Sequence, residues 1–168
     1  NIEPGETVSI VGPSGSGKST LMNLIGCLDS PTDGSIKIAG RDVTGLKESH
    51  LADVRRKNIG FIFQRFHLIP TLTVKENIEL PSIFAKDKVV NGNLTDLLER
   101  IGLRDKQNLR SSMISGGDKQ MVSIARALLY DPKVIIADEP TGRLEAKERD
   151  TVMSLFRELA NSGLAIVI

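Results

Sequence analysis

The sequence feature that most constrains the fold of this chain is the glycine-rich segment "GPSGSGKS" at residues 12–19. It follows the apolar run "TVSIV" and precedes the amphipathic run "TLMNLIG", so a strand should enter the segment and a helix should leave it. This is the context in which the spacing G-x-x-x-x-G-K-[ST] predicts a phosphate-binding loop. Glycines let the backbone N–H groups point inward, and the following helix directs its positive end to the same place. We therefore expect a phosphate to lie in this loop.

Different side chains of the loop are expected to bind the phosphates and the metal ion of a nucleoside triphosphate. Lys18 is expected to reach the outer phosphates, and Ser19 can bind Mg²⁺. The predicted nucleotide-binding residues are Gly12, Pro13, Ser14, Gly15, Ser16, Gly17, Lys18, Ser19 and Thr20. The loop predicts a bound triphosphate, but it does not say how the triphosphate is used.

A pair of carboxylates follows a second apolar run, "KVIIADEP". The run should place Asp138 at the carboxyl end of a strand, where open α/β sheets bind ligands, and Asp138 can hold Mg²⁺ through water there. Glu139 comes next and is well placed to deprotonate an attacking water, so we predict that it is the general base. The alternative is that Glu139 only caps the segment before Pro140.

The remaining apolar patterns predict the fold. Runs of strand length begin at residues 7, 59, 134 and 164, and such unbroken β-branched runs fit strands buried on both faces of a parallel sheet. Helical patterns lie between them, and "PTDGSIKIAG" reads as a turn and a short strand of a small antiparallel patch. Residues 66–130 lack a strand run and predict a helical subdomain inserted into an α/β core. We expect one domain over residues 1–168, with a P-loop NTPase fold.

Composition excludes several classes of protein. The chain has 168 residues, 40% of them apolar, and its net charge of +1 offers no broad electrostatic attraction for nucleic acid. The single cysteine, Cys27, cannot form an internal disulfide and is predicted to be an ordinary buried thiol of a reducing compartment. No apolar run approaches the length that crosses a bilayer, so we expect any link to a membrane to come through a partner.

A third segment, "MISGGDKQMVSIARAL", reads as a Ser-Gly-Gly turn that opens a helix. Ser115 and Asp118 have the spacing of a capping box, so one interpretation is simply a well-capped helix. Two adjacent glycines at a helix start also allow a phosphate to approach the backbone closely. Since one nucleotide needs one such cradle, a second cradle indicates a nucleotide bound elsewhere.

These segments, together with Gln64 in "FIFQRFHLIPTLTVKENI" and the stretch "IIADEPTGRLEAK", resemble the nucleotide-binding domain of ATP-binding cassette (ABC) transporters over nearly the whole chain. The wording "LIGCLDSPTDG" and "FHLIPTLTVKENIELP" further resembles the branch that serves lipoprotein release and macrolide-type efflux.

The resemblance implies a set of roles. ATP and Mg²⁺ would be the cofactors, with Ser19, Gln64 and Asp138 at the metal and Glu139, Lys18 and Gln64 as the catalytic residues. Ser115, Gly116 and Gly117 would contact the γ-phosphate of ATP held by a second copy, in a head-to-tail homodimer. The ATPase would power a transmembrane permease from the cytoplasmic face of the plasma membrane, with Gln64 sensing the permease.

The chain departs from the family pattern at Ile114, Asp118, Met121 and Glu145. Asp118 favours the helix dipole by about 0.3–1 kcal/mol. A carboxylate about 6 Å from a phosphate charge would cost about 3 kcal/mol at an effective dielectric of 20, which would weaken the dimer if Asp118 faces the nucleotide.

The ends of the chain carry a further expectation. The family has an aromatic residue that stacks on adenine before the phosphate loop and a histidine beyond the last strand. Neither has a counterpart here, so we expect a domain truncated at both ends and inactive when isolated.

Other functions were weighed. A small kinase or GTPase fits poorly with the Ser-Gly-Gly turn and the pair of Asp138 and Glu139. An ABC ATPase that clamps DNA would need a long coiled coil, and fewer than 100 residues separate Lys18 from Ser115. A soluble ABC protein acting on ribosomes and a module that binds ATP without hydrolysis stay open. The sequence indicates neither the cargo nor the direction of transport.

Overall fold

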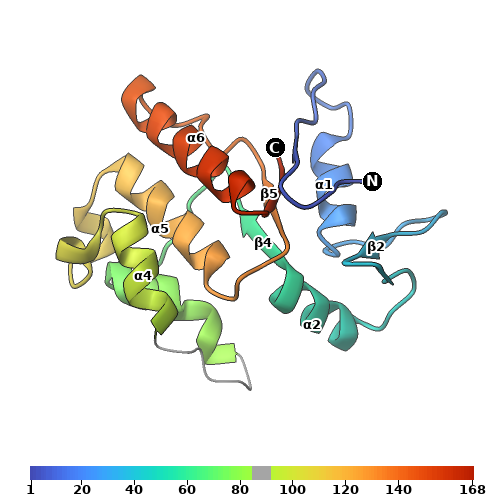
Figure 1. The fold of residues 1–168 in the computed structure, drawn as a ribbon, viewed down its shortest axis with the longest axis horizontal. Coiled ribbons are helices and arrows are strands. Elements are labelled where there is room, and N and C mark those ends of the chain that lie inside the picture. Colours follow the sequence, from blue (N-terminus) through green and yellow to red (C-terminus); the bar gives the residue numbers. More distant parts are fainter. Residues whose placement is uncertain (85–91) are drawn as a thin grey trace.

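A four-stranded parallel sheet forms the centre of the molecule in the computed structural model, which describes residues 1–84 and 92–168 (Figure 1). The strands lie in the order β1-β6-β5-β4, and each neighbouring pair is parallel. Their bounds are Thr7–Val8 for β1, Ile59–Ile62 for β4, Val134–Ala137 for β5 and Ala165–Val167 for β6. The predicted α/β fold with a mostly parallel sheet is confirmed.

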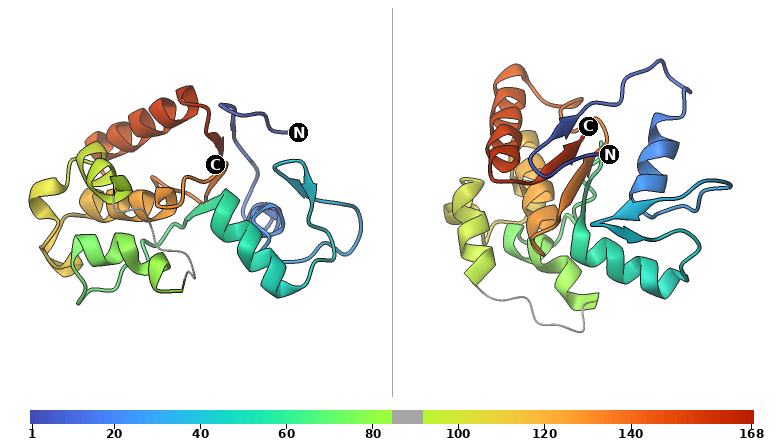
Figure 2. Two further views of the ribbon diagram at one scale, coloured as in Figure 1. Left: turned by 60° about the horizontal axis from the view of Figure 1, so that its bottom comes forward. Right: turned by 45° about the vertical axis from the view of Figure 1, so that its right-hand side comes forward.

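Helices cover both faces of this sheet (Figures 1 and 2). Helices α5 (Gly116–Leu128) and α6 (Ala146–Asn161) lie on one face, and α1 (Lys18–Ile25) and α2 (Glu48–Asn58) lie on the other. Successive strand residues serve opposite cores, because Ile135 packs in the cluster of α5 and α6 while Ile136 packs with Met22 and Leu51. The apolar runs are therefore continuous because both faces of the sheet are buried.

The first apolar run behaves differently from the other three. Strand β1 has two residues, Val8 is only half-buried and Val11 is 87% exposed, so the prediction of a strand buried on both faces is wrong here. The physical reason is its position, since β1 lies at the edge of the described sheet and pairs only with β6. The chain stays attached beyond Val8, where the Ile10 N–H donates to the Ile168 carbonyl over 2.7 Å.

The small antiparallel patch is confirmed. It consists of β2 (Lys37–Ile38) and β3 (Arg41–Asp42), which pair antiparallel. The turn before it lies where the sequence predicts it, with Gly34 at a φ of +87° and its N–H donating to the Asp33 carboxylate. Positive φ at this position requires glycine or a residue that tolerates strain.

The described part of the stretch 66–130 consists of helices and the loops that connect them, and its residues 85–91 lie outside the described residues. It contains α3 (Val74–Glu79), a 3₁₀ turn (Leu80–Phe84), α4 (Gly92–Arg100), two further 3₁₀ turns (Arg104–Lys106 and Ser111–Met113) and α5. Within its described part the only β pairing is an isolated bridge between Thr73 and Arg110. Residues of α3, α4 and α5 share one core with the sheet, and the assignment of this stretch as a separate subdomain stays a prediction.

The lone cysteine matches its predicted character. Cys27 is 2% exposed and packs in the core beneath α1 and α2, and burial raises the pKa of its thiol. A buried thiol with a raised pKa is a poor nucleophile. Cys27 is therefore part of the packing and not of a reactive site.

Candidate nucleotide-binding site

The phosphate loop connects β1 to α1 and is open to solvent along its length. Gly15 and Gly17 adopt φ values of +80° and +93°, which side chains rarely tolerate, so these glycines are required by the turn. Gly17 is the N-cap of α1 and forms no side-chain hydrogen bond to the helix start. The first N–H groups of α1 therefore lack a side-chain cap, so they can donate to the oxygens of a bound phosphate.

The predicted loop residues occupy two places. Residues 12–17 form the loop, and Lys18, Ser19 and Thr20 begin α1. The Lys18 ammonium donates to the carbonyls of Gly12 and Pro13 over 2.8 and 2.9 Å, so it lies back across the loop. Its positive charge is thereby held where the loop's N–H groups would receive phosphate oxygens.

Ser19 and Asp138 meet although 119 residues separate them in the sequence. The Ser19 hydroxyl donates to Asp138 Oδ2 over 3.4 Å. The fold explains this proximity: β1 and β5 are parallel, so the segments that leave them emerge at the same edge of the sheet. A hydroxyl and a carboxylate together suit Mg²⁺, which binds through few protein oxygens and completes its shell with waters and phosphates.

Glu139 is held in an unusual backbone conformation beside Asp138. Its φ is +46°, a left-handed conformation that costs a non-glycine residue about 1–2 kcal/mol. Such strain is typical of functional sites, where the surrounding structure enforces it. The Gln64 amide donates to the Glu139 carboxylate over 2.5 Å. Gln64 therefore enters the site through Glu139, whose carboxylate it fixes.

The Ser-Gly-Gly turn forms the predicted capping box at the start of α5. The Asp118 N–H donates to Ser115 Oγ over 3.0 Å, and the Ser115 N–H donates to Asp118 Oδ2 over 3.4 Å. The Lys106 ammonium lies 2.7 Å from the same Asp118 oxygen. The Asp118 carboxylate is thus turned back onto its own helix end and paired with a lysine, which offsets its negative charge.

This turn does not lie with the phosphate loop of the same chain. Helix α5 packs on one face of the sheet and α1 on the other, and the start of α5 lies on the side of the molecule remote from α1 (Figures 1 and 2). Five of the predicted residues lie together at the carboxyl ends of the parallel strands: Lys18, Ser19, Gln64, Asp138 and Glu139. The structure places Ser115, Gly116 and Gly117 elsewhere.

The two glycines of the turn differ in their surroundings. A β-carbon on Gly116 would meet nothing within 4 Å, whereas one on Gly117 would lie 2.5 Å from Glu148 Oε1. The Gly117 N–H donates to that oxygen over 2.8 Å, and the Glu145 N–H donates to Glu148 Oε2 over 3.2 Å. Glu148 was not predicted, because nothing in the sequence indicates that the start of α6 lies against the start of α5.

Arg126 is a second residue that the sequence did not single out. Its guanidinium donates to the carbonyls of Phe66 and His67 over 2.8 and 2.7 Å, and burial lowers its pKa. It thereby ties α5 to the segment directly after Gln64. A signal existed in the sequence, since an arginine within the apolar run "SIARALL" must find acceptors when the helix is buried.

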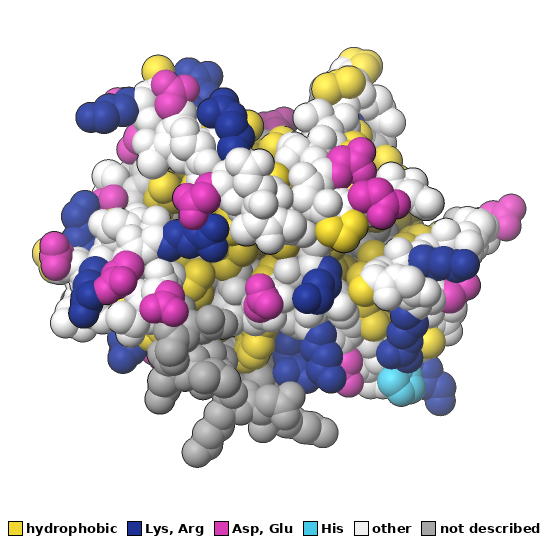
Figure 3. Space-filling view, in the orientation of Figure 1, with side chains coloured by type: hydrophobic (Ala, Val, Ile, Leu, Met, Phe, Trp, Pro, Cys, Tyr) yellow, Lys and Arg dark blue, Asp and Glu magenta, His cyan; other side chains and the backbone are white. Residues whose placement is uncertain are grey.

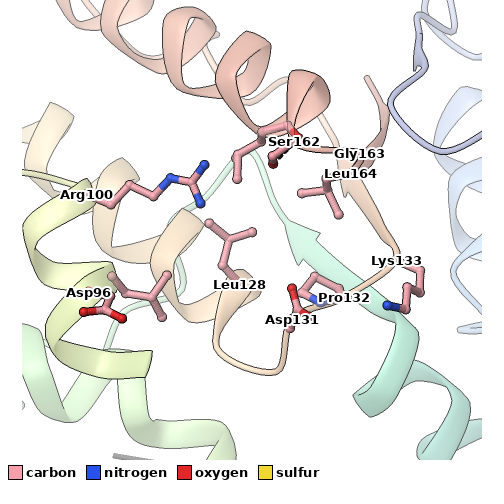
Figure 4. Close-up of a pocket in the computed structure, with 11 residues that line it drawn as sticks. Asp96, Arg100, Leu128, Asp131, Pro132, Lys133, Ser162, Gly163 and Leu164 are labelled. Carbon is pink, nitrogen blue, oxygen red and sulfur yellow. Dashed lines mark hydrogen bonds between the residues drawn. The ribbon is translucent and has the colours of Figure 1, made fainter. Parts of the chain in front are cut away.

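A separate hollow of about 440 Å³ lies at the other end of the strands from the candidate site (Figure 4). Its lining includes Arg100, Asp131, Lys133 and Ser162, from α4 and from the segments that precede β5 and β6. These residues lie at the amino ends of the strands, whereas Asp138 follows the carboxyl end of β5. The hollow is therefore distinct from the candidate nucleotide site.

Acidic and basic side chains are intermixed on the face in Figure 3, in keeping with the net charge of +1. Among residues 1–84 and 92–168, none of the helices has the length and apolar character needed to cross a membrane.

A glycine-rich loop between a parallel strand and a helix, with an acidic pair beyond a nearby strand, defines a P-loop nucleoside triphosphatase domain. Residues 1–142 match the family described as ABC transporter. The chain belongs to the ABC transporter family, whose ATP-binding domains bind and hydrolyse ATP.

Several relatives are similar over nearly the whole chain. The macrolide export ATP-binding/permease protein MacB of Salmonella typhimurium is 48% identical over 99% of this chain, which covers 26% of that protein. The uncharacterized ABC transporter ATP-binding protein YvrO of Bacillus subtilis is 46% identical over 99% of this chain, which covers 74% of that protein. The predicted resemblance to macrolide-type exporters is thereby confirmed.

Solved structures agree in fold. The ATP-binding cassette MJ0796, in a dimeric post-hydrolysis state bound to ADP and Pi, superimposes with a TM-score of 0.86 at 42% identity. The match covers 99% of this chain and 75% of that one. A second dimeric structure of MJ0796, a bacterial ABC transporter cassette, gives a TM-score of 0.85 at the same identity.

Proposed function

We propose that this chain is the ATP-hydrolysing subunit of a membrane transporter and that its site consists of the residues gathered at the carboxyl edge of the sheet. The observation that carries the proposal is the meeting of Ser19 with Asp138, because it joins the phosphate loop to the carboxylate pair. Lys18 neutralises the outer phosphates, and the N–H groups of the loop and of α1 bind their oxygens. Ser19 and Asp138 hold Mg²⁺, which offsets the negative charge of the phosphates when bound.

Glu139 is the general base in this proposal. Its carboxylate follows directly on Asp138 and accepts a hydrogen bond from Gln64, which orients the carboxylate. Glu139 takes a proton from the attacking water, and Gln64 keeps the carboxylate oriented for that transfer. The left-handed backbone at Glu139 is consistent with a residue held in place for chemistry.

The second cradle completes the site of another copy. Ser115 and Gly116 are exposed, and a side chain on Gly116 would meet open space, so a ligand can approach the turn from outside. Since the turn and the phosphate loop lie far apart in one chain, two copies arranged head to tail would place each turn against the other's ATP. The relative MJ0796, solved as a dimer, supports the association of two copies.

The transport role also involves a permease. The MacB relatives are named as ATP-binding/permease proteins, and this chain covers about a quarter of their length. We propose that the domain works at the cytoplasmic face of the plasma membrane and passes the energy of ATP hydrolysis to a permease of the macrolide-efflux type. The segment from Gln64 onward, tied to α5 by Arg126, is the proposed route of communication.

The substitution Glu139→Gln tests the chemistry. In the full-length protein it keeps the shape and the contact with Gln64 but removes the base, so ATP binding should persist while turnover falls by about 10²–10⁴-fold. Phosphate release at saturating ATP and Mg²⁺ measures turnover, and a fluorescent ATP titration measures binding. Glu158→Gln, which removes an exposed carboxylate paired with Arg100, is the matched control and should stay within about twofold of the parent. Turnover of the Glu139 variant equal to this control would place the base elsewhere.

A further inference from the structure

The contact between Glu148 and Gly117 bears on how two copies close around ATP. Gly117 is the second residue of α5, and its N–H is one of the helix-start donors that has no partner within the helix. In the proposed dimer this donor belongs to the cradle for the γ-phosphate. In the single chain it is already engaged, since it donates to the Glu148 carboxylate over 2.8 Å.

The Glu148 carboxylate lies close to the Gly117 backbone. A β-carbon on Gly117 would lie 2.5 Å from Glu148 Oε1 and 2.7 Å from its carboxyl carbon, so the second glycine of the turn is needed to admit this carboxylate. The other glycine, Gly116, faces open space. The turn is thus occupied by an internal anion at Gly117 and open to an external one at Gly116.

The two carboxylates at this turn are held differently. Asp118 is paired with the Lys106 ammonium over 2.7 Å, so its charge is offset by a cation. Glu148 is held by two backbone N–H groups, those of Gly117 and Glu145. A phosphate that approaches Gly117 would therefore face the Glu148 charge directly, and two anions on one N–H repel each other.

We propose that Glu148 is an internal competitor for the second cradle and sets the ATP concentration at which two copies close; this inference rests on the proposed head-to-tail dimer. In the separate chain the carboxylate satisfies the Gly117 N–H and stabilises the start of α5. On closure the γ-phosphate of the other copy's ATP takes that N–H, and Glu148 turns away. The same movement releases the Glu145 N–H, six residues after Glu139, so the segment beyond the base responds to the partner's nucleotide.

The test measures ATP-dependent dimerisation of the purified protein, with Glu139→Gln present throughout so that ATP persists. Glu148→Ala removes the competitor, and Glu148→Gln keeps a neutral oxygen that holds the N–H more weakly. Asp150→Asn is the matched control, because it removes one exposed carboxylate from the same end of α6. Sedimentation velocity over a series of ATP concentrations gives the midpoint of dimerisation for each protein.

We expect Glu148→Ala to lower the midpoint about tenfold relative to Asp150→Asn, which corresponds to about 1.4 kcal/mol, with Glu148→Gln in between. ATP binding by the separate chains, followed with a fluorescent analogue at low protein concentration, should stay within about twofold, because Glu148 is remote from the phosphate loop of its own chain. Thermal unfolding checks that each variant folds, and Glu148→Gln alone is compared with the control if Glu148→Ala does not.

The outcomes separate this inference from the proposed function. Equal midpoints for the Glu148 variants and Asp150→Asn would overturn the competitor while leaving the dimer intact. A higher midpoint would also overturn it, since Glu148 would then be a clamp that the turn needs. If ATP produced no dimer in any of the proteins, the proposed head-to-tail function would fail, and the competitor with it.

Discussion

Lys18 shows how a single side chain is used at the residue scale. Its ammonium is bound to the Gly12 and Pro13 carbonyls, so the positive charge is positioned before any phosphate arrives. A ligand then meets a charge already in place and need not order a flexible side chain. The sequence motif predicts this lysine because its type and spacing are fixed by phosphate chemistry. The partners of Asp118 and Glu148 could not be predicted, since Lys106 and the start of α6 meet the turn only after folding.

We expect Lys18→Ala to abolish measurable nucleotide binding while leaving the fold intact, because Lys18 supplies charge and contributes little to the core. A fluorescent ATP titration tests the first half, and circular dichroism tests the second. Lys75→Ala, which removes an exposed lysine of α3, is the control and should bind as the parent does. ATP binding by Lys18→Ala at the parent's affinity would contradict the assignment of the loop.

At the element scale, sequence periodicity predicted the helices α1, α4, α5 and α6 and the strands β4, β5 and β6, but it did not single out α2. It failed where an element's neighbours decide the outcome. The apolar runs that form β4, β5 and β6 lie between two hydrophobic cores. Their residues are apolar because both faces of these strands are buried. The run at residue 7 looks the same in sequence, but its strand lies at the edge of the described sheet. Order within a sheet is a property of pairing, and a single strand does not encode it.

Arg126 joins two elements, and its loss should be measurable in stability. In Arg126→Met the side chain keeps an unbranched apolar stem but no longer donates to the Phe66 and His67 carbonyls, so we expect the free energy of unfolding to fall by about 1.5–3 kcal/mol. Urea denaturation measures this change. Arg157→Met, which replaces an exposed arginine of α6, is the control and should change stability by less than about 0.5 kcal/mol. Equal stability of the two variants would mean that the hydrogen bonds of Arg126 do not stabilise the fold.

At the scale of the whole molecule, the two parts of the proposed ATP site lie far apart in one chain. The phosphate loop, Asp138 and Glu139 lie at one edge of the sheet, and the Ser-Gly-Gly turn lies on the helical side remote from α1 (Figure 1). The sequence predicted both halves, because each has a local motif. In the proposed dimer, a single chain therefore contributes to two sites, and a second copy completes each of them.

Mixing two inactive variants tests this central claim most directly. Lys18→Ala removes the loop's grip on ATP, and Gly116→Glu places a carboxylate on the open face of the turn, where the structure has room for it. In a head-to-tail pair of one copy of each, one site keeps an intact loop and an intact turn. With Glu139→Gln in both chains, sedimentation velocity should show an ATP-dependent dimer in the mixture and in the parent, and none in either variant alone. A mixture that stays monomeric while the parent dimerises, or either variant dimerising alone as the parent does, would contradict the account.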